Sequence, residues 1–307
     1  MRITATVAAA LAVALSSGPT WADVPQHHRV DIVQQAVDAG VAAAAADGVT
    51  QHVSLVDRTT GRLVASDGGG VQVVSESIVK LFTVAYYLVQ YDGHLPGDLA
   101  ADLHQMIVRS DDALESRYWT TAAVPAMATR YHLGSTANGP KTGPHDWGWE
   151  YITADDEALF LYRMSVDPVV GPFLMDAMAQ VAPVGADGFD QHFGFNALSG
   201  AHGSKQGAHG SKQGWTDRNT SDAINIHSVG WTARYFGAIL ETSDSPQYDT
   251  MREDSTATAQ RVAALPSPAP AAAVELTSAD RTALSTISNR VDALVRHLLS
   301  VLGAGSR

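Results

Sequence analysis

The chain has 307 residues, of which 45% are hydrophobic, and a formal net charge of −12 at pH 7. This length and composition predict one enzyme-sized domain with a substantial core. The negative charge argues against a nucleic-acid partner, because neutralising phosphates needs a basic surface. The sequence contains no cysteine, which excludes disulfides and a lipid-anchored cysteine within it.

Residues 1–22 have the pattern of a secretory signal peptide. Arg2 precedes an apolar stretch over residues 8–15, and Ala22 stands before Asp23, where we expect the mature protein to begin. The stretch is too short to span a bilayer comfortably, and no later segment comes close to the required length. We therefore expect a secreted or cell-envelope protein without a membrane span.

The rest of the chain divides into elements in a regular order. A helix is predicted over residues 31–46, followed by a hairpin of strands at 51–57 and 62–66. Residues 77–181 are mostly helical, with breaks at 93–96, at Ser110, in the Gly- and Pro-rich loop 134–144, and at the capping box that Thr153 opens. Three late strands, two of them at 224–229 and 235–240, precede a helix at about 250–265.

This order predicts an α/β (α+β) fold for residues 23–265. An antiparallel sheet carries the two terminal helices on one face, and the middle helices form a separate all-helical lobe.

The C-terminal residues form two further predicted segments. Residues 266–276 have the composition of a Pro/Ala linker. Residues 277–302 predict an amphipathic helix, because six apolar side chains repeat at spacings of three and four: Leu284, Ile287, Val291, Leu294, Leu298 and Val301. Such a helix either mediates self-association or docks on its own domain.

The most informative motif is the pair Ser77 and Lys80. Residues three apart share one helix face, so the hydroxyl and the amine can meet. The apolar residues 81–89 predict a buried helix, and burial favours an uncharged amine that could take the serine proton. The alternative is an ordinary helix start, with Ser75 or Ser77 as the cap and Lys80 in solvent.

Two further triplets follow in the chain. Ser110 is followed by Asp111 and Asp112, and Lys212 opens a run through Gln213 and Gly214 to Trp215. The order Ser-x-x-Lys, Ser-Asp-Asn-like, Lys-x-Gly resembles that of the class A β-lactamase and penicillin-binding protein superfamily. Residues 151–159 also look like the segment that closes this family's active-site loop. The resemblance covers residues 31–265 and implies a β-lactamase/transpeptidase-like fold.

The resemblance implies a role for each matched residue. Ser77 would be the acylated nucleophile, with Lys80 as its proton acceptor. Ser110 would relay the proton to the leaving nitrogen, and Lys212 would keep the site electropositive. The backbone amides of Ser77 and Trp215 would form the oxyanion hole.

The substrate-binding positions that the resemblance implies are Asp112, Gln213, Gly214 and Trp215, and two of them depart from the family. Asp112 replaces the usual asparagine with a carboxylate, and Gln213 replaces the usual threonine or serine hydroxyl with an amide. Both changes affect how an ordinary penicillin would be held.

The base that hydrolyses the ester in class A enzymes has no convincing counterpart. The loop 139–150 is short, and its candidates for a deacylation base are Glu150 and Asp146. Lys141, Thr142 and Gly143 spell the third motif literally, but their Gly- and Pro-rich surroundings predict a loop rather than a strand.

The segment Gly-Ala-His-Gly-Ser-Lys-Gln occurs at residues 200–206 and again at 207–213. A shift of seven would turn the two lysines to opposite faces of a continuous strand, so only one can fill the site, and we favour Lys212 over Lys205. The nearby histidines match no zinc-binding spacing and are expected to be solvated loop residues: His192, His202 and His209. We predict no metal and no cofactor.

These observations predict a secreted serine acyl-enzyme hydrolase that acts on a small molecule, a β-lactam or a related amide, through an ester of Ser77. A D-alanyl-D-alanine peptidase of the cell envelope is a second possibility, because the same motifs serve both. A third is a catalytically weak binding module, which Asp112, Gln213 and the repeat would favour.

Overall fold

The computed structural model describes residues 26–198, 209–216 and 223–265. The predicted signal peptide (1–22), linker (266–276), C-terminal helix (277–302), Lys205 and His202 lie outside these residues. Within the described ranges, no helix combines the length and the apolar character needed to cross a membrane.

A five-stranded antiparallel sheet forms the centre of the fold, in the order β2-β1-β7-β6-β5. The hairpin of β1 (Thr50–Asp57) and β2 (Leu63–Asp67) precedes the helical lobe, whereas β5 (Gly210–Trp215), β6 (Ile224–Trp231) and β7 (Tyr235–Ser243) follow it. Pairing of β1 with β7, in which Val53 faces Ile239, joins the two parts. The predicted antiparallel sheet is confirmed.

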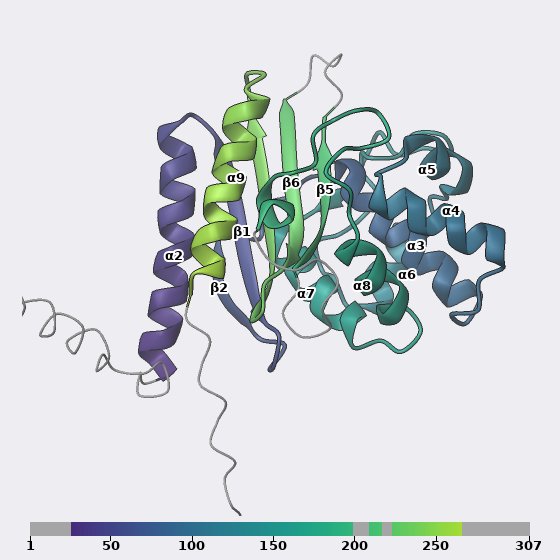
Figure 1. The fold of residues 1–307 in the computed structure, drawn as a ribbon, viewed down its shortest axis with the longest axis horizontal. Helices are drawn as coiled ribbons and strands as arrows, with labels where there is room; N and C mark the ends of the chain where they lie inside the picture. Colours follow the sequence, from purple (N-terminus) through teal and green to yellow (C-terminus); the bar gives the residue numbers. More distant parts are fainter. Residues whose placement is uncertain (1–25, 199–208, 217–222, 266–307) are drawn as a thin grey trace, which may run out of the picture. The chain divides into compact units, whose positions relative to one another are not determined.

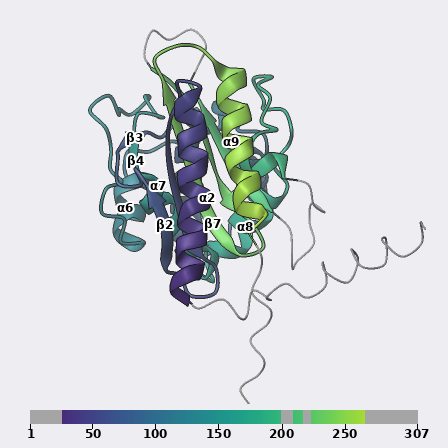
Figure 2. The ribbon, with the colours of Figure 1, turned by 90° about the vertical axis from the view of Figure 1, so that its left-hand side faces the viewer.

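Two terminal helices cover one face of the sheet, as predicted. α2 (Gln26–Ala46) and α9 (Tyr248–Ala263) lie side by side, at the left in Figure 1 and in front of the strands in Figure 2. They pack closely because Gly40 has no side chain, and a Cβ there would lie 2.5 Å from Thr258 Oγ1. Val37, Leu55 and Ile239 are buried in the layer between the helices and the sheet.

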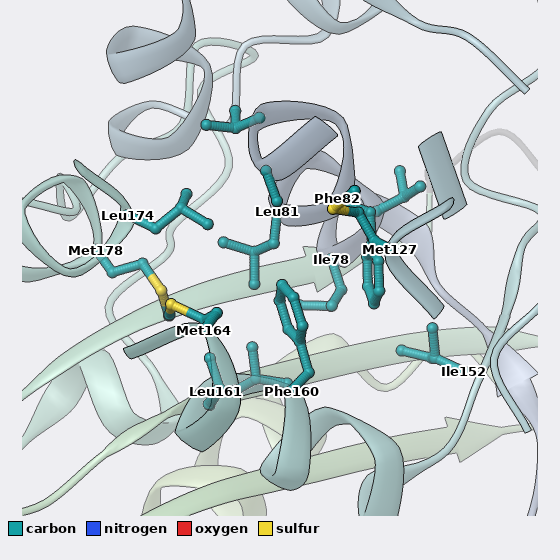
Figure 3. Close-up of a cluster of buried hydrophobic side chains, with 14 of the residues drawn as sticks. Ile78, Leu81, Phe82, Met127, Ile152, Phe160, Leu161, Met164, Leu174 and Met178 are labelled. Carbon is teal, nitrogen blue, oxygen red and sulfur yellow. The ribbon is translucent and has the colours of Figure 1, made fainter. Parts of the chain in front are cut away.

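The middle helices lie against the other face and beside it (Figure 1). α7 (Ala154–Ser165) packs on β1 and β7, and the lobe beyond it contains α3 (Val79–Gln90), α4 (Gly97–Val108), α5 (Asp112–Tyr118), α6 (Ala123–Arg130) and α8 (Gly171–Ala179). Side chains from α3, α6, α7 and α8 meet in one buried cluster (Figure 3). Phe82 and Phe160 stack at its centre, with ring centroids 4.6 Å apart.

Several short elements have no clear sequence pattern. β3 (Val73–Val74) pairs with β4 (Tyr151–Ile152) in a second small sheet, and two short 3₁₀ helices, η2 (Glu76–Ile78) and η3 (Gly194–Ala197), precede α3 and β5. Two residues are too few to show an alternation. The predicted cap at Thr153 is confirmed, because its hydroxyl accepts from the backbone N–H of Asp156 at 3.2 Å.

Candidate active site

Ser77 and Lys80 meet where η2 passes into α3. Lys80 Nζ donates a hydrogen bond to Ser77 Oγ at 2.6 Å, and the two residues are 5% and 0% exposed. Neither η2 nor α3 has a side-chain cap, so the alternative of a capping serine and a solvated lysine is wrong. Glu76, immediately before the serine, has a φ of +47°, a left-handed conformation that is uncommon for a side chain of this kind and typical of functional turns.

Lys80 has two further partners. Its Nζ donates to Asp112 Oδ1 at 2.8 Å and lies 4.1 Å from the centre of the Trp147 ring. The lysine is fully buried, whereas 54% of the Asp112 side chain is exposed. Lys80 therefore joins the Ser77 motif to the motif that carries Asp112.

Ser110 and Lys212 form a second buried pair. Lys212 Nζ donates to Ser110 Oγ at 2.7 Å and to the Gln213 carbonyl oxygen at 2.6 Å. Burial lowers the pKa of Lys212 well below its ordinary value, and the charge of Lys80 lowers it further. Ser110 has a φ of +52°, and the next residue, Asp111, caps α5 through Ala113 N and Leu114 N. This turn places Ser110 and Asp112 on either side of the capping residue.

β5 passes close to η2 because Gly214 has no side chain. A Cβ at this position would lie 3.2 Å from Glu76 Cβ and from the Ser75 carbonyl oxygen. The next residue, Trp215, stacks on Phe189 with ring centroids 4.6 Å apart, and its Nε1 donates to Asp187 Oδ2 at 3.0 Å. The third motif is thereby held beside the element that carries Ser77.

A cavity of about 1020 Å³ opens over these residues. Ser77 and Asp112 line it, together with Glu76 from η2 and the aromatic side chains Trp147, Trp149, Tyr151, Phe189 and Trp215. Of the predicted site, the structure thus brings together Ser77, Lys80, Ser110, Asp112, Lys212, Gly214 and Trp215. The lysines and Ser110 lie behind the cavity wall, since each is at most 1% exposed.

Gln213 does not occupy the predicted position at the substrate. Its side chain is fully buried, and its Nε2 donates to Ser211 Oγ at 2.9 Å and to Ser228 Oγ at 3.5 Å. Successive side chains of a strand point to opposite faces, so Lys212 and Gln213 cannot both face Ser110. An amide contact from Gln213 to a substrate does not fit this position.

Glu150 is likewise placed away from the cavity. Its Oε2 accepts from Gly148 N at 2.8 Å and from Ser75 Oγ at 3.2 Å, and its Oε1 accepts from Thr142 Oγ1 at 3.0 Å. Burial raises the pKa of this carboxyl. These contacts fasten the loop to the residues before Ser77, so Glu150 does not fit the role of deacylation base, and Asp146 is exposed and does not line the cavity.

The literal third motif at Lys141, Thr142 and Gly143 lies in a loop outside any strand, as predicted. Lys141 nevertheless lines the cavity, with Nζ 4.0 Å from the centre of the Trp149 ring. His192 is exposed as expected, but His209 is only 4% exposed, so its prediction as a solvated residue is wrong. Among the described residues, no three acidic or histidine side chains gather in a way that could hold a metal ion.

Three side chains at the site were missed in the sequence. The Trp147 ring contacts Lys80 Nζ, as described above. Glu76 Oε1 accepts from Thr216 Oγ1 and Asn225 Nδ2 at 2.9 Å each, and Glu115 Oε1 accepts from Thr83 Oγ1 at 2.6 Å. Desolvation raises the pKa of Glu76 and of Glu115 to about 7. Glu115 follows Asp112 by three residues on α5, a spacing that could have placed it on the same helix face.

Solved structures share this architecture over most of their length. A class A β-lactamase from Bacteroides cellulosilyticus aligns with a TM-score of 0.57 at 14% identity and covers 75% of this chain and 98% of that chain. A β-lactamase from Xanthomonas campestris gives 0.57 at 14% identity over 76% and 98%, and an ancestral (GNCA) class A β-lactamase gives 0.56 at 16% identity over 75% and 98%. The chain has the fold of class A β-lactamases.

Sequence comparison finds relatives of this chain that are named as lipoproteins. "Putative lipoprotein LppW" of Mycobacterium tuberculosis, and the protein of that name in Mycobacterium bovis, are 35% identical to the chain over 176 residues. The match covers 53% of this chain and 53% of each relative, so it spans about half the length of both. No family model matches the sequence.

Proposed function

We propose that the chain is an exported serine hydrolase that cleaves a β-lactam or a related amide through an ester of Ser77. The observation that carries this proposal is the buried hydrogen bond of 2.6 Å between Ser77 Oγ and Lys80 Nζ beside the cavity. A nucleophile and a base within hydrogen-bond reach are the minimum for acyl transfer by a serine.

In the acylation step, Ser77 Oγ attacks the carbonyl carbon while uncharged Lys80 takes the hydroxyl proton. The amide C–N bond then breaks, and Ser110 passes a proton to the leaving nitrogen. Lys212, 2.7 Å from Ser110 Oγ, orients that hydroxyl and returns a proton to it. Burial lowers the pKa of Lys212, which makes its ammonium a stronger acid and so favours the return of a proton to Ser110.

The negative oxygen that forms on the carbonyl needs hydrogen-bond donors. The backbone N–H groups of Ser77 and Trp215 would supply them, with β5 held against η2 at Gly214. One donor of this kind is worth about 3 kcal/mol in acyl-transfer enzymes.

The ester formed by acylation must then be hydrolysed by water. Because both oxygens of Glu150 are engaged by its own loop, this carboxyl is a poor base for that water. This observation favours a second candidate function, a D-alanyl-D-alanine peptidase of the cell envelope, in which a β-lactam ester persists.

Intact-mass spectrometry tests both candidates after incubation with a penicillin and a cephalosporin. The wild-type chain should gain the mass of one β-lactam, and peptide mapping should place it on Ser77. Ser77→Ala should gain nothing, whereas Ser165→Ala, a matched control at the last residue of α7, should react as the wild type. If the folded wild-type chain formed no Ser77-dependent adduct, the proposed hydrolase activity would be contradicted. The remaining candidate would then be a catalytically weak binding module.

The lifetime of the adduct separates the two enzymes. Loss of the added mass within seconds indicates a β-lactamase, and persistence over hours indicates the peptidase. Because the lifetime is measured on a β-lactam adduct, this measurement does not require the natural substrate to be known.

We place the protein outside the cytoplasm, in the secreted fraction or the cell envelope. The signal-peptide pattern of residues 1–22 supports this location, as does the word lipoprotein in the name of the relatives. Fractionation of cells expressing the full sequence tests it, and retention in the cytoplasm would contradict it.

A further inference from the structure

We propose that Asp112 is a cation-binding subsite beside the nucleophile, so that the preferred substrate carries a protonated amine or a guanidinium next to the acyl group. This inference rests on the proposed function, since it concerns the substrate of the Ser77 ester. It predicts a selectivity between substrates that differ only in charge.

The position of Asp112 is fixed by its contact with the catalytic pair. Its Oδ1 accepts from Lys80 Nζ at 2.8 Å, and Lys80 Nζ is 2.6 Å from Ser77 Oγ. Asp112 lines the cavity with Ser77, and 54% of its side chain is exposed. One lysine contact therefore anchors the carboxylate, while the rest of it remains open to a ligand.

The other carboxylates that line the described part of the cavity have internal partners. Asp187 accepts from Phe189 N at 2.9 Å through Oδ1 and from Trp215 Nε1 at 3.0 Å through Oδ2. Glu76 Oε1 accepts from Thr216 and Asn225, as described above. Asp112 is thus the carboxylate best placed to meet a substrate.

The chemistry of the group decides what it can meet. A carboxylate only accepts hydrogen bonds, so Asp112 cannot donate to a carbonyl of the substrate as a neutral amide could. A protonated amine or a guanidinium supplies both the donors and the opposite charge.

The charge of the substrate is also linked to the reaction. Lys80 must lose its proton before it can act as the base, and Asp112 then loses its counter-ion. A substrate cation at Asp112 replaces that counter-ion and so keeps the carboxylate paired. Substrates with this cation are expected to acylate Ser77 faster, as well as to bind more tightly.

Three penicillins that differ at one side-chain carbon test the inference: benzyl, α-aminobenzyl and α-carboxybenzyl. The second-order rate constant of acylation, followed by intact mass, should be about 5-fold higher for the amine than for the neutral compound, the upper end of the range for a partly exposed ion pair. It should be lower again for the carboxylate. Raising the salt concentration should reduce these differences.

Asp112→Asn should bring the three rate constants within about 2-fold of one another, because asparagine carries no charge and cannot form the ion pair. Their ratio within one variant cancels any general effect on Lys80. Asp146→Asn removes one charge from an exposed residue of the loop 139–150 and should keep the wild-type order.

Equal rates in the wild type, or a preference for the amine that persists in Asp112→Asn, would overturn the inference and leave the hydrolase intact. Failure of all three compounds to acylate Ser77 would instead count against the proposed function.

Discussion

Glu115 is a fully buried carboxyl on α5, one turn after Asp112. Its Oε1 accepts from Thr83 Oγ1, and its Oε2 has no hydrogen-bond partner. Burial raises its pKa from 4.5 to about 7, although the charges of Lys80 and Lys212 oppose the shift. Near neutral pH this group therefore changes charge next to the proposed catalytic lysines.

The pKa of Glu115 predicts a pH-dependent stability difference between the wild type and Glu115→Gln. The folded-state pKa is raised, so the stability linked to the protonated carboxyl is complete below pH 4.5 and is lost as the pH rises through about 7. Glutamine does not titrate. The variant should gain up to ~3 kcal/mol of unfolding free energy relative to the wild type between acidic and alkaline pH.

Urea denaturation at a series of pH values measures this gain. The side-chain amide of the Glu115→Gln variant also lacks a partner for one of its polar atoms, and this lowers the free energy of unfolding by the same amount at every pH. The change of the stability difference with pH therefore does not contain this contribution. Glu253→Gln, at an exposed position on α9, serves as the control. A difference for Glu115→Gln that does not change with pH would contradict the buried titration.

The helical spacing of Ser77 and Lys80 predicted that these two side chains meet, whereas Ser110 and Lys212 were predicted from the resemblance in motif order. Trp147 could not be found in this way. It contacts Lys80 across 67 positions of the chain and lies in a loop without periodicity. Gln213 was misplaced for a different reason, since a strand turns neighbouring side chains to opposite faces.

At the scale of elements, the loop 139–150 is positioned by the segment before Ser77. Backbone bonds run from Ser75 N to the Glu150 carbonyl oxygen at 2.7 Å and from Glu76 N to the Gly148 carbonyl oxygen at 3.0 Å. The side chain of Glu150 closes the same junction. The loop is therefore built into the site as a wall that carries Trp147 to Lys80.

Glu150→Gln should weaken this junction without changing the chemistry at Ser77. At least one of the three acceptor contacts is lost, so the free energy of unfolding should fall by about 1–3 kcal/mol. The lifetime of the Ser77 ester should stay within about 2-fold of the wild type, because a general base usually contributes 100-fold or more and Glu150 does not line the cavity.

Thermal or urea denaturation measures the first effect, and the intact-mass time course measures the second. Asp146→Asn, in the same loop but exposed, is the matched variant for both. An ester that survives 100-fold longer in Glu150→Gln than in the wild type would restore Glu150 as the deacylation base.

At the scale of the described molecule, one buried cluster joins two layers, the sheet and the middle helices. This cluster contains Val56, Val229 and Leu240 from the sheet as well as Leu81 and Phe160 from the helices, and Figure 3 shows how closely its side chains meet. The site lies where the layers meet, since Ser77 precedes α3 in the lobe and Lys212 belongs to β5 in the sheet.

The order of helices and strands was predictable because each long element has its own hydrophobic period. The fit between the layers was not, because it depends on contacts such as that of Phe82 with Phe160, which are far apart in the sequence. The helix predicted over residues 277–302 stays a prediction.

Phe160→Ala tests whether the two layers unfold together. Phe160 is fully buried and stacks on Phe82, so its truncation should lower the free energy of unfolding by about 3–5 kcal/mol. Val166→Ala, at a position that is 63% exposed, should change it by less than about 0.5 kcal/mol. Because the cluster reaches both layers, the destabilised variant should still unfold in one transition, with circular dichroism and tryptophan fluorescence coinciding. Two separated transitions would mean that the lobe and the sheet are stable apart, and the pairing of Ser77 with β5 would then depend on a weak interface.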